Sequence, residues 1–105
     1  MSVSTHVLDS VLGRPAAGIA VRLLAGDELV ADGVTDRDGR CMLTEDATAL
    51  GTHRLVFATG QWFAEQGREA FYPEVVLTFV VQEPAEHHHV PLLLAPFAYS
   101  TYRGS

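Results

Sequence analysis

Apolar side chains recur at every second position in three segments of the chain, residues 19–23, 54–58 and 75–81. The longest series begins at Val75, ends at Val81 and presents four apolar side chains to one face. A period of two is that of a β-strand with one face buried, whereas a helix would repeat every three or four residues. The pattern therefore predicts strands over all three segments.

Turn-forming residues separate the strand-like segments. Three turn sequences each lie between two such segments. They are Gly and Pro at residues 13–15, Gly at 25–27, and Asp-Arg-Asp-Gly at 36–39. Only residues 61–66, which are followed by Gly67, suit a helix, and a short one. About seven or eight short strands spaced roughly ten residues apart predict an all-β antiparallel sandwich. With no linker in view, we expect residues 1–105 to form a single domain.

The charge of the chain narrows the possible partners. The 105 residues contain 13 acidic and 7 basic side chains, giving a formal net charge of −6, and every basic residue is Arg. The absence of Lys excludes Schiff-base chemistry and a P-loop lysine. Nucleic acids and anionic membranes attract clustered positive charge, which this chain lacks. We therefore expect neither as a partner.

The single cysteine and the sequence of the first residues indicate the cellular compartment in which we expect the protein. Cys41 has no second cysteine to pair with, so an intramolecular disulfide and a Cys-based zinc site are both excluded. The first residues lack the charged and then apolar pattern of a signal peptide, and no apolar run approaches the roughly 20 residues that span a bilayer. We expect a cytoplasmic protein.

A histidine cluster is the first candidate for chemistry. On a strand, His87 and His89 would share one face and His88 would lie on the other. A His-x-His pair is a common two-ligand arm for a metal, and His6, within a predicted strand at residues 3–8, could supply a third ligand. No carboxylate or cysteine stands at a helpful spacing nearby. The same spacing is also that of one histidine in a polar pocket with the others facing solvent, and we favour this interpretation over the metal site.

Arg40, directly after the turn at 36–39, is the second candidate. As a solvated charge it would pair with Asp36 or Asp38, which is worth only about 0–1 kcal/mol at a surface. Alternatively, its planar guanidinium offers a fixed fork of donors for a carbonyl oxygen or an oxyanion. The sequence leaves both interpretations open.

The last seven residues, 99–105, are the third candidate. They carry two tyrosines and an arginine in strand-like alternation, whereas chain ends usually fray and carry plain polar residues. We therefore predict a packed tail, in which Gly104 supplies unusual backbone angles that bend the last residue inward. Together, the histidines, Arg40 and the tail could form a metal-free general acid–base site. These residues alone name no substrate.

Four segments resemble the transthyretin-like 5-hydroxyisourate hydrolases, and the likeness runs in order over the whole chain. The final Tyr-Arg-Gly-Ser is the most specific of them, because the hormone-carrying transthyretins share the fold but end differently. Two positions depart from the family pattern: His88 stands where an aromatic residue is usual, and Ala98 where Gly is common. The matching segments are residues 4–9 with 13–16, residues 35–40, residues 71–75, and residues 87–94 with 99–105.

The resemblance implies a sandwich of two four-stranded sheets that assembles as a homotetramer, with sites in a channel between dimers. It implies opening of the lactam ring of 5-hydroxyisourate to 2-oxo-4-hydroxy-4-carboxy-5-ureidoimidazoline in urate catabolism, without metal or cofactor. The alternative is a non-catalytic transthyretin-type carrier of a small ligand. The implied catalytic residues are His6, Arg40, His89 and Ser105, and the implied substrate contacts are His6, Arg40 and Tyr102.

The residue chemistry suits those roles. A histidine exchanges protons near neutral pH, and Arg40 can hold an oxyanion. We expect His6 to act as base or to position the water, and His89 to orient the substrate or relay a proton, although the residues do not decide which histidine activates the water. Ser105 would present a hydroxyl and an α-carboxylate, and Tyr102 would line the pocket beside it.

Overall fold

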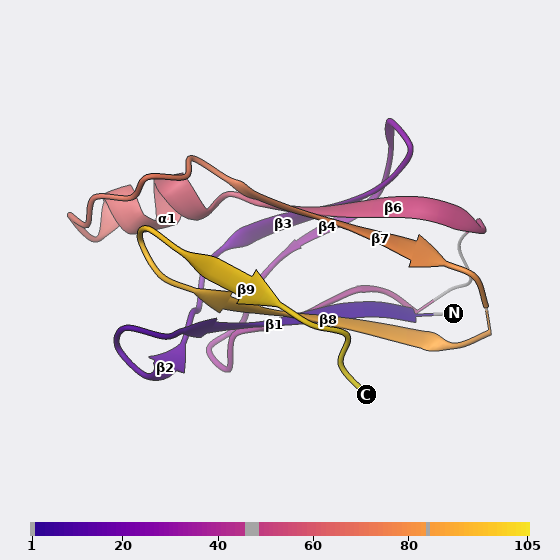
Figure 1. Ribbon diagram of the computed structural model, residues 1–105, viewed down its shortest axis with the longest axis horizontal. Helices are drawn as coiled ribbons and strands as arrows, with labels where there is room; N and C mark the ends of the chain where they lie inside the picture. The colour runs from indigo at the N-terminus through magenta and orange to yellow at the C-terminus, as the bar shows by residue number, and fades with distance from the viewer. Residues whose placement is uncertain (1, 46–48, 84) are drawn as a thin grey trace.

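Two β-sheets pack face to face, and one short helix lies at an end of the sandwich (Figure 1). The computed structural model describes residues 2–45, 49–83 and 85–105. The predicted two-layer β-architecture with a single short helix is confirmed. Its elements are β1 Ser2–Asp9, β2 Arg14–Pro15, β3 Ala20–Ala25, β4 Glu28–Val34, β5 Arg40–Thr44, β6 Gly51–Phe57, α1 Thr59–Glu65, β7 Val75–Val81, β8 His87–Leu94 and β9 Tyr99–Thr101.

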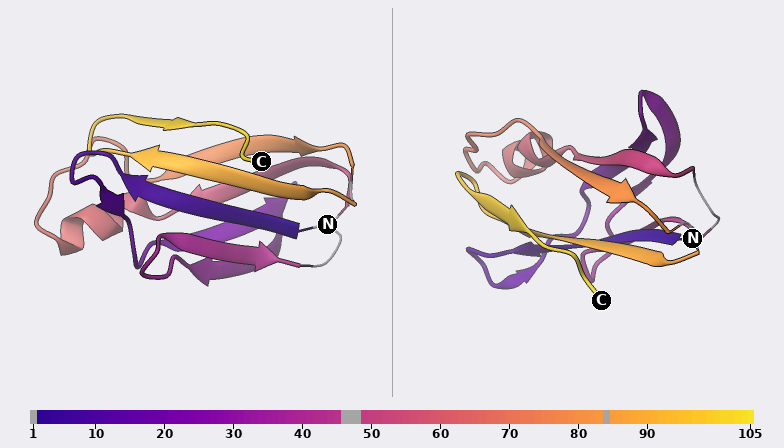
Figure 2. Two further views of the ribbon diagram at one scale, coloured as in Figure 1. Left: turned by 90° about the horizontal axis from the view of Figure 1, so that it is seen from below. Right: turned by 45° about the vertical axis from the view of Figure 1, so that its right-hand side comes forward.

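The first sheet has the order β2-β1-β8-β9, with β5 also paired along β1, and the second has the order β4-β3-β6-β7. Figure 2 shows β9, β8, β1 and β5 following one another across the first sheet. Strands β1 and β8 run parallel, and every other pairing in the described residues is antiparallel. The sequence predicted antiparallel pairing only. A parallel pair needs a long crossover, which the strands of the second sheet provide here.

The core lies between the sheets and consists of the side chains that the alternation pointed inward. Val21 and Leu23 of β3 and Leu55 and Phe57 of β6 are fully buried, and Phe79 of β7 packs against them while partly exposed. Full burial of such a side chain contributes roughly 1.5–3 kcal/mol. The three predicted strand segments are therefore confirmed, because each buries its apolar series in this core.

Helix α1 covers one end of the core. Phe63 is buried there, and the indole N–H of Trp62 donates to the carbonyl oxygen of Ala17 at 2.7 Å. The helix begins at Thr59, two residues before the predicted start at residue 61. The N–H of Gly60, in its first turn, donates to the carbonyl of Pro73, which follows the helix in the chain. No side chain caps this start, so no sequence signal marked it. Within the described residues, no helix is long and apolar enough to cross a membrane.

A buried ion pair ties the end of β1 to the segment after α1. The carboxylate of Asp9 accepts the guanidinium of Arg68 at 2.7 Å and the backbone N–H groups of Val11 and Leu12, both at 3.0 Å. Burial alone would raise the pKa of Asp9, but Arg68 and the two N–H groups outweigh it, so this pKa lies below its ordinary value of 3.8. The charged carboxylate is therefore the form that the fold requires.

We predict that Asp9→Asn lowers the free energy of unfolding by about 3 kcal/mol, because it leaves the Arg68 charge without its anion. The stabilisation of the folded state by charged Asp9 is fully present above pH 3.8, the ordinary pKa that applies to the unfolded chain. It is lost as the pH falls through the lower pKa of Asp9 in the folded protein. The difference between wild type and variant should therefore shrink in acid. Urea unfolding at pH 7 and pH 3 measures both effects, with the exposed Asp27→Asn as control. Equal stability of wild type and Asp9→Asn at pH 7 would contradict the prediction.

Candidate active site

The polar outer face of the first sheet carries the candidate site. On β1, Val3 and Val7 point into the core, so the alternating residues Ser4 and His6 belong to the outer face. On β8, His88 is only 6% exposed, whereas His87 and His89 lie on the outer face with their rings stacked, centroids 6.2 Å apart. The predicted division of the three histidines is thus what the structure has.

Strand register brings these residues together from three strands. In the parallel pair, Ser4 of β1 is the partner of His89 of β8. In the antiparallel pair, His6 of β1 is the partner of Arg40 of β5. Directly opposed residues have their Cβ atoms roughly 4.5–5.5 Å apart and project from the same face. His6 therefore lies on the strand between Arg40 and the β8 histidines.

The turn before β5 holds Arg40 in place through its own hydrogen bonds. The carboxylate of Asp36 accepts the backbone N–H groups of Asp38 and Arg40, each at 2.9 Å. The buried hydroxyl of Thr35 donates to the carbonyl of Ala16 at 2.8 Å and so anchors the start of the turn. These contacts explain why Thr and Asp stand at their positions in this motif.

Gly39 closes the turn against β1. Its φ of +77° suits glycine, and a Cβ at this position would lie 2.4 Å from the carbonyl oxygen of Val7. Arg40 follows directly, and its guanidinium pairs with neither Asp36 nor Asp38 in the described structure. The alternative that Arg40 only forms a surface ion pair with one of these aspartates is therefore not what the structure has. The guanidinium donors remain available at the site.

A pocket of about 430 Å³ lies over this face and brings together three of the predicted site residues, Arg40, His89 and Ser105. His6 does not line this pocket, but it is the strand partner of Arg40, which does. The assignment of catalytic roles to these residues remains a prediction. The lining residues are Ser4, Thr5, Asp36, Arg40, Cys41, Met42, His87, His89 and Ser105.

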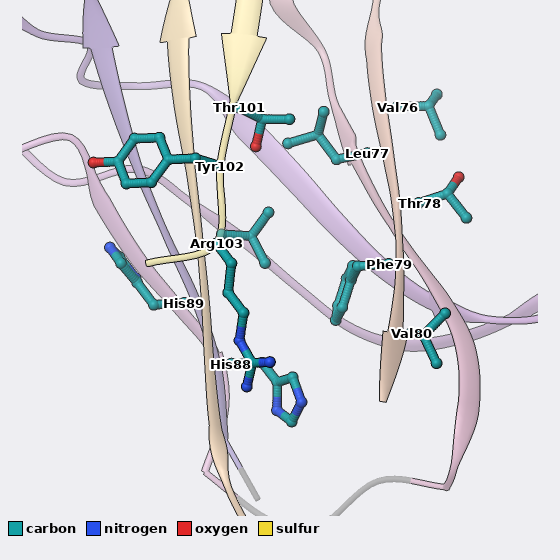
Figure 3. Close-up of a pocket in the computed structure, with 11 residues that line it drawn as sticks. Val76, Leu77, Thr78, Phe79, Val80, His88, His89, Thr101, Tyr102 and Arg103 are labelled. Carbon is teal, nitrogen blue, oxygen red and sulfur yellow. The ribbon is translucent and has the colours of Figure 1, made fainter. Parts of the chain in front are cut away.

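Tyr102 lies instead in a neighbouring pocket of about 390 Å³ between β7, β8 and the tail. Figure 3 shows the Tyr102 ring and the His89 imidazole to the left of β8, while Phe79 and Val80 of β7 lie to the right of β8. His89 lines both pockets, so it is the residue that joins Tyr102 to Arg40 and Ser105.

His89 has a defined hydrogen bond and a shifted pKa. Its Nδ1 lies 2.8 Å from the hydroxyl oxygen of Ser4, which also lies 3.0 Å from Nε2 of His87. Burial lowers the pKa of His89, and the neighbouring His87, His6 and Arg40 lower it further. The imidazole is therefore neutral at neutral pH, the form that can exchange a proton with a reactant.

The tail is ordered, as the alternation predicted. Strand β9 pairs with β8, the Thr101 hydroxyl donates to the carbonyl of Pro91 at 2.7 Å, and the Gly104 N–H donates to the carbonyl of His89 at 2.9 Å. Tyr102 nevertheless stays 59% exposed. The reason for Gly104 differs from the expected one: its φ is not positive, but a Cβ there would lie 2.4 Å from Cδ2 of His89. Close approach to His89, and not an unusual turn, requires the glycine.

The metal-arm hypothesis finds no three-ligand group. Among the described residues, no three or more His, Cys, Asp or Glu side chains are placed to hold a metal ion. His6, His87 and His89 are therefore not such a group in the described structure.

Sequence reasoning missed Ser4 as part of the site, and it considered His87 only as a possible metal ligand. The position of Ser4 two residues before His6 did place both on one strand face. The signal was incomplete because the parallel pairing that sets Ser4 between two histidines joins segments more than eighty residues apart.

Fold and site together define a transthyretin-like β-sandwich that carries a histidine and arginine cluster on the outer face of one sheet. The sequence model of the HIUase/Transthyretin family matches residues 3–104. The chain belongs to this family.

Two relatives named 5-hydroxyisourate hydrolase are similar over nearly the whole chain. The protein of Salmonella dublin is 42% identical, over 98% of this chain and 80% of its own length. The solved structure of the Klebsiella pneumoniae protein is 39% identical, covers all of both chains and superimposes with a TM-score of 0.93. Sea bream transthyretin, solved in complex with thyroxine, is 30% identical, with a TM-score of 0.87 over 97% of this chain and 93% of its own.

We predict that His89 titrates below the ordinary histidine value of 6.5, because burial and three cationic or protonatable neighbours disfavour its charged form. Nuclear magnetic resonance of the imidazole signals across pH 4 to 8 measures this, with assignment from His89→Gln. A midpoint above 6.5 would contradict the proposed environment.

Gly104→Ala should displace either the tail or the His89 ring, because its Cβ would overlap the imidazole. The His89 resonances should therefore shift, while the free energy of unfolding changes little because the core is untouched. Ser100→Ala, at an exposed position of the same tail, is the control and should leave the His89 signals in place. Unshifted His89 signals in Gly104→Ala would argue against the close packing.

Proposed function

We propose that this protein hydrolyses the lactam ring of 5-hydroxyisourate and yields 2-oxo-4-hydroxy-4-carboxy-5-ureidoimidazoline in urate catabolism. The observation that carries the proposal is the convergence of Arg40, His89 and Ser105 in one pocket, with His6 opposite Arg40. These are the positions at which the sequence resembles the hydrolases. The relatives named 5-hydroxyisourate hydrolase support the same activity.

Lactam opening needs a nucleophile, a site for negative charge on the carbonyl oxygen, and a proton for the departing nitrogen. In the proposed mechanism, His6 positions a water and accepts its proton. The guanidinium of Arg40, which has no competing carboxylate partner within the described residues, donates to the developing oxyanion. His89 supplies the proton to the ring nitrogen as the carbon–nitrogen bond breaks.

The tail would enclose the substrate in this mechanism. Ser105 lines the pocket of Arg40 and His89, and Tyr102 lines the adjoining pocket on the other flank of His89. We assign Tyr102 to substrate contact, together with His6 and Arg40, and Ser105 to the catalytic set. No metal or organic cofactor takes part in the proposed steps.

The site lies on an exposed sheet face, so a second subunit laid over that face would exclude water from it. We therefore propose a homotetramer of single-domain chains spanning residues 1–105, with sites between subunits, acting in the cytoplasm on a small molecule. The net charge of −6 with no basic run argues against nucleic-acid and anionic-membrane partners.

The competing function is that of a carrier, because sea bream transthyretin shares this fold and was solved with thyroxine. A carrier would bind a ligand without turnover. The decisive experiment generates 5-hydroxyisourate with urate oxidase and follows its ultraviolet absorbance with and without the protein. Acceleration over the spontaneous decay, in proportion to protein concentration, supports the hydrolase; decay at the blank rate refutes it.

A parallel sample of the protein, dialysed against a strong chelator, should keep its hydrolase activity. A loss of activity that zinc restores would refute the metal-free mechanism.

Arg40→Lys should lower kcat by roughly 10²-fold or more, although the charge is retained, because Lys lacks the planar fork of donors. The fold should be unchanged by circular dichroism. Arg37→Lys, an exposed arginine in the same turn that does not line the pocket, is the matched control and should keep the wild-type rate. Near-normal rates for both Arg40→Lys and Arg40→Ala would make Arg40 a turn residue without a catalytic role.

A further inference from the structure

Four side chains on the outer face of the first sheet form a continuous line of hydrogen bonds. The hydroxyl of Ser2 contacts Nδ1 of His87, and Nε2 of His87 lies 3.0 Å from the hydroxyl oxygen of Ser4. That oxygen lies 2.8 Å from Nδ1 of His89. Among the described residues, nothing hydrogen-bonds to Nε2 of His89. The line therefore starts at the first residues of β1 and β8 and ends at one available ring nitrogen.

The hydroxyl of Ser4 carries a single hydrogen, which links the tautomers of the two histidines. That hydrogen can go to only one of the two neutral imidazoles, so the other ring must donate an N–H to the oxygen. Donation by both rings would leave the Ser4 hydrogen without an acceptor among the described residues, so we assign one ring as donor and the other as acceptor. When Nε2 of His87 donates, Nδ1 of His89 must accept, and the hydrogen of His89 is then on Nε2. In the reverse arrangement, Nε2 of His89 carries the lone pair.

The backbone holds this arrangement in place. The parallel register pairs Ser2 with His87 and Ser4 with His89, so each serine lies beside its histidine. The rings of His87 and His89 stack with only 15° between their planes, and Ser4 is 9% exposed. Water has little room to replace the serine hydroxyl between the two imidazoles.

Several charged and titratable groups surround His89. These groups are His87 on the same strand, His6 on β1, Arg40 on β5, Asp36 in the turn before β5, and Tyr102 and Arg103 in the tail. Arg103 has its own partner in Glu86, at 3.0 Å. Burial first, and then His87, His6 and Arg40, disfavour a doubly protonated His89, so its pKa is lowered and the ring passes a proton on instead of keeping it.

We propose that Ser4 is a positioning residue that holds His89 with its proton on Nε2, and that Ser4 and His87 deliver a replacement proton from solvent to Nδ1 when Nε2 gives its own away. The inference rests on the proposed hydrolysis. When Nε2 of His89 gives its proton to the departing ring nitrogen, Nδ1 takes the Ser4 hydroxyl proton and Ser4 takes the proton on Nε2 of His87. Nδ1 of His87 then takes the Ser2 hydroxyl proton, and Ser2 takes one from solvent. His89 is left with its hydrogen on Nδ1, and the starting tautomer returns when Nε2 takes a proton from solvent and the same transfers run in reverse. The water nucleophile loses one proton to His6, which releases it to solvent, so the protons balance over the cycle.

Kinetics of three variants test this pathway. Ser4→Ala should lower kcat roughly 10-fold while KM stays within about twofold, the scale at which an orienting partner acts. Ser4→Thr restores a hydroxyl and should recover most of the rate. His87→Gln keeps an N–H that can donate to Ser4 but cannot transfer a proton, so its kcat should also fall. Ser10→Ala is the matched control, because Ser10 directly follows β1 and its hydroxyl donates to the carbonyl of Leu94, away from the histidines.

The results separate the inference from the proposed function. If wild type fails to accelerate the decay of 5-hydroxyisourate, the proposed function is wrong. If wild type is active and Ser4→Ala keeps its kcat, the positioning role is refuted; if His87→Gln keeps its kcat, the proton pathway is refuted. An equal loss in Ser4→Thr and Ser4→Ala would also count against the hydroxyl.

Nitrogen-15 shifts of the imidazoles provide a readout that does not depend on activity. In wild type and in His87→Gln, His89 should be mainly the Nε2–H tautomer, and in Ser4→Ala the two tautomers should mix. A wild-type His89 with its hydrogen on Nδ1, or a Ser4→Ala spectrum like that of wild type, would overturn the assignment whatever the substrate.

Discussion

The position of β1 between β5 and β8 is the constraint on which the rest of the site depends. One side of β1 sets His6 opposite Arg40, and the other sets Ser4 opposite His89. A shift of either register by one residue would turn these side chains into the core, because successive residues of a strand point to opposite faces. The buried Val3 and Val7 oppose such a shift, since it would expose them.

The same strand supports the fold at its end. Asp9 closes β1 with a buried carboxylate that holds the following turn and Arg68 together. Arg68 in turn lies over the rings of Trp62 and Phe63 beside the core. Strand β1 thus has apolar residues in the core, an ion-paired residue near the helix and polar residues at the pocket. The residues that stabilise the fold and those proposed for chemistry are at different positions of this one strand.

The residues packed around His89 set the charge state, the hydrogen-bonded nitrogen and the direction of its ring. Burial and neighbouring groups keep its ring neutral, Ser4 bonds one ring nitrogen, and Gly104 allows the tail to lie directly against the ring. Each restriction comes from a different segment of the chain. An exposed histidine with free rotation would lack a preferred tautomer and direction, and would serve proton transfer less well.

The sequence by itself determined the strands, the turn and the face on which each residue lies. Alternation assigned His87 and His89 to one face and His88 to the other, and the Asp-rich turn ending at Gly39 placed Arg40 at the start of a strand. These are local properties, because strand period and turn hydrogen bonds involve residues close in sequence. Tertiary structure alone decided which strands are neighbours. A period of two fixes the face of a side chain but not its partner across the sheet, so the parallel pairing of β1 with β8, the place of Ser4 between two histidines and the contact of Gly104 with His89 arise only in the folded chain.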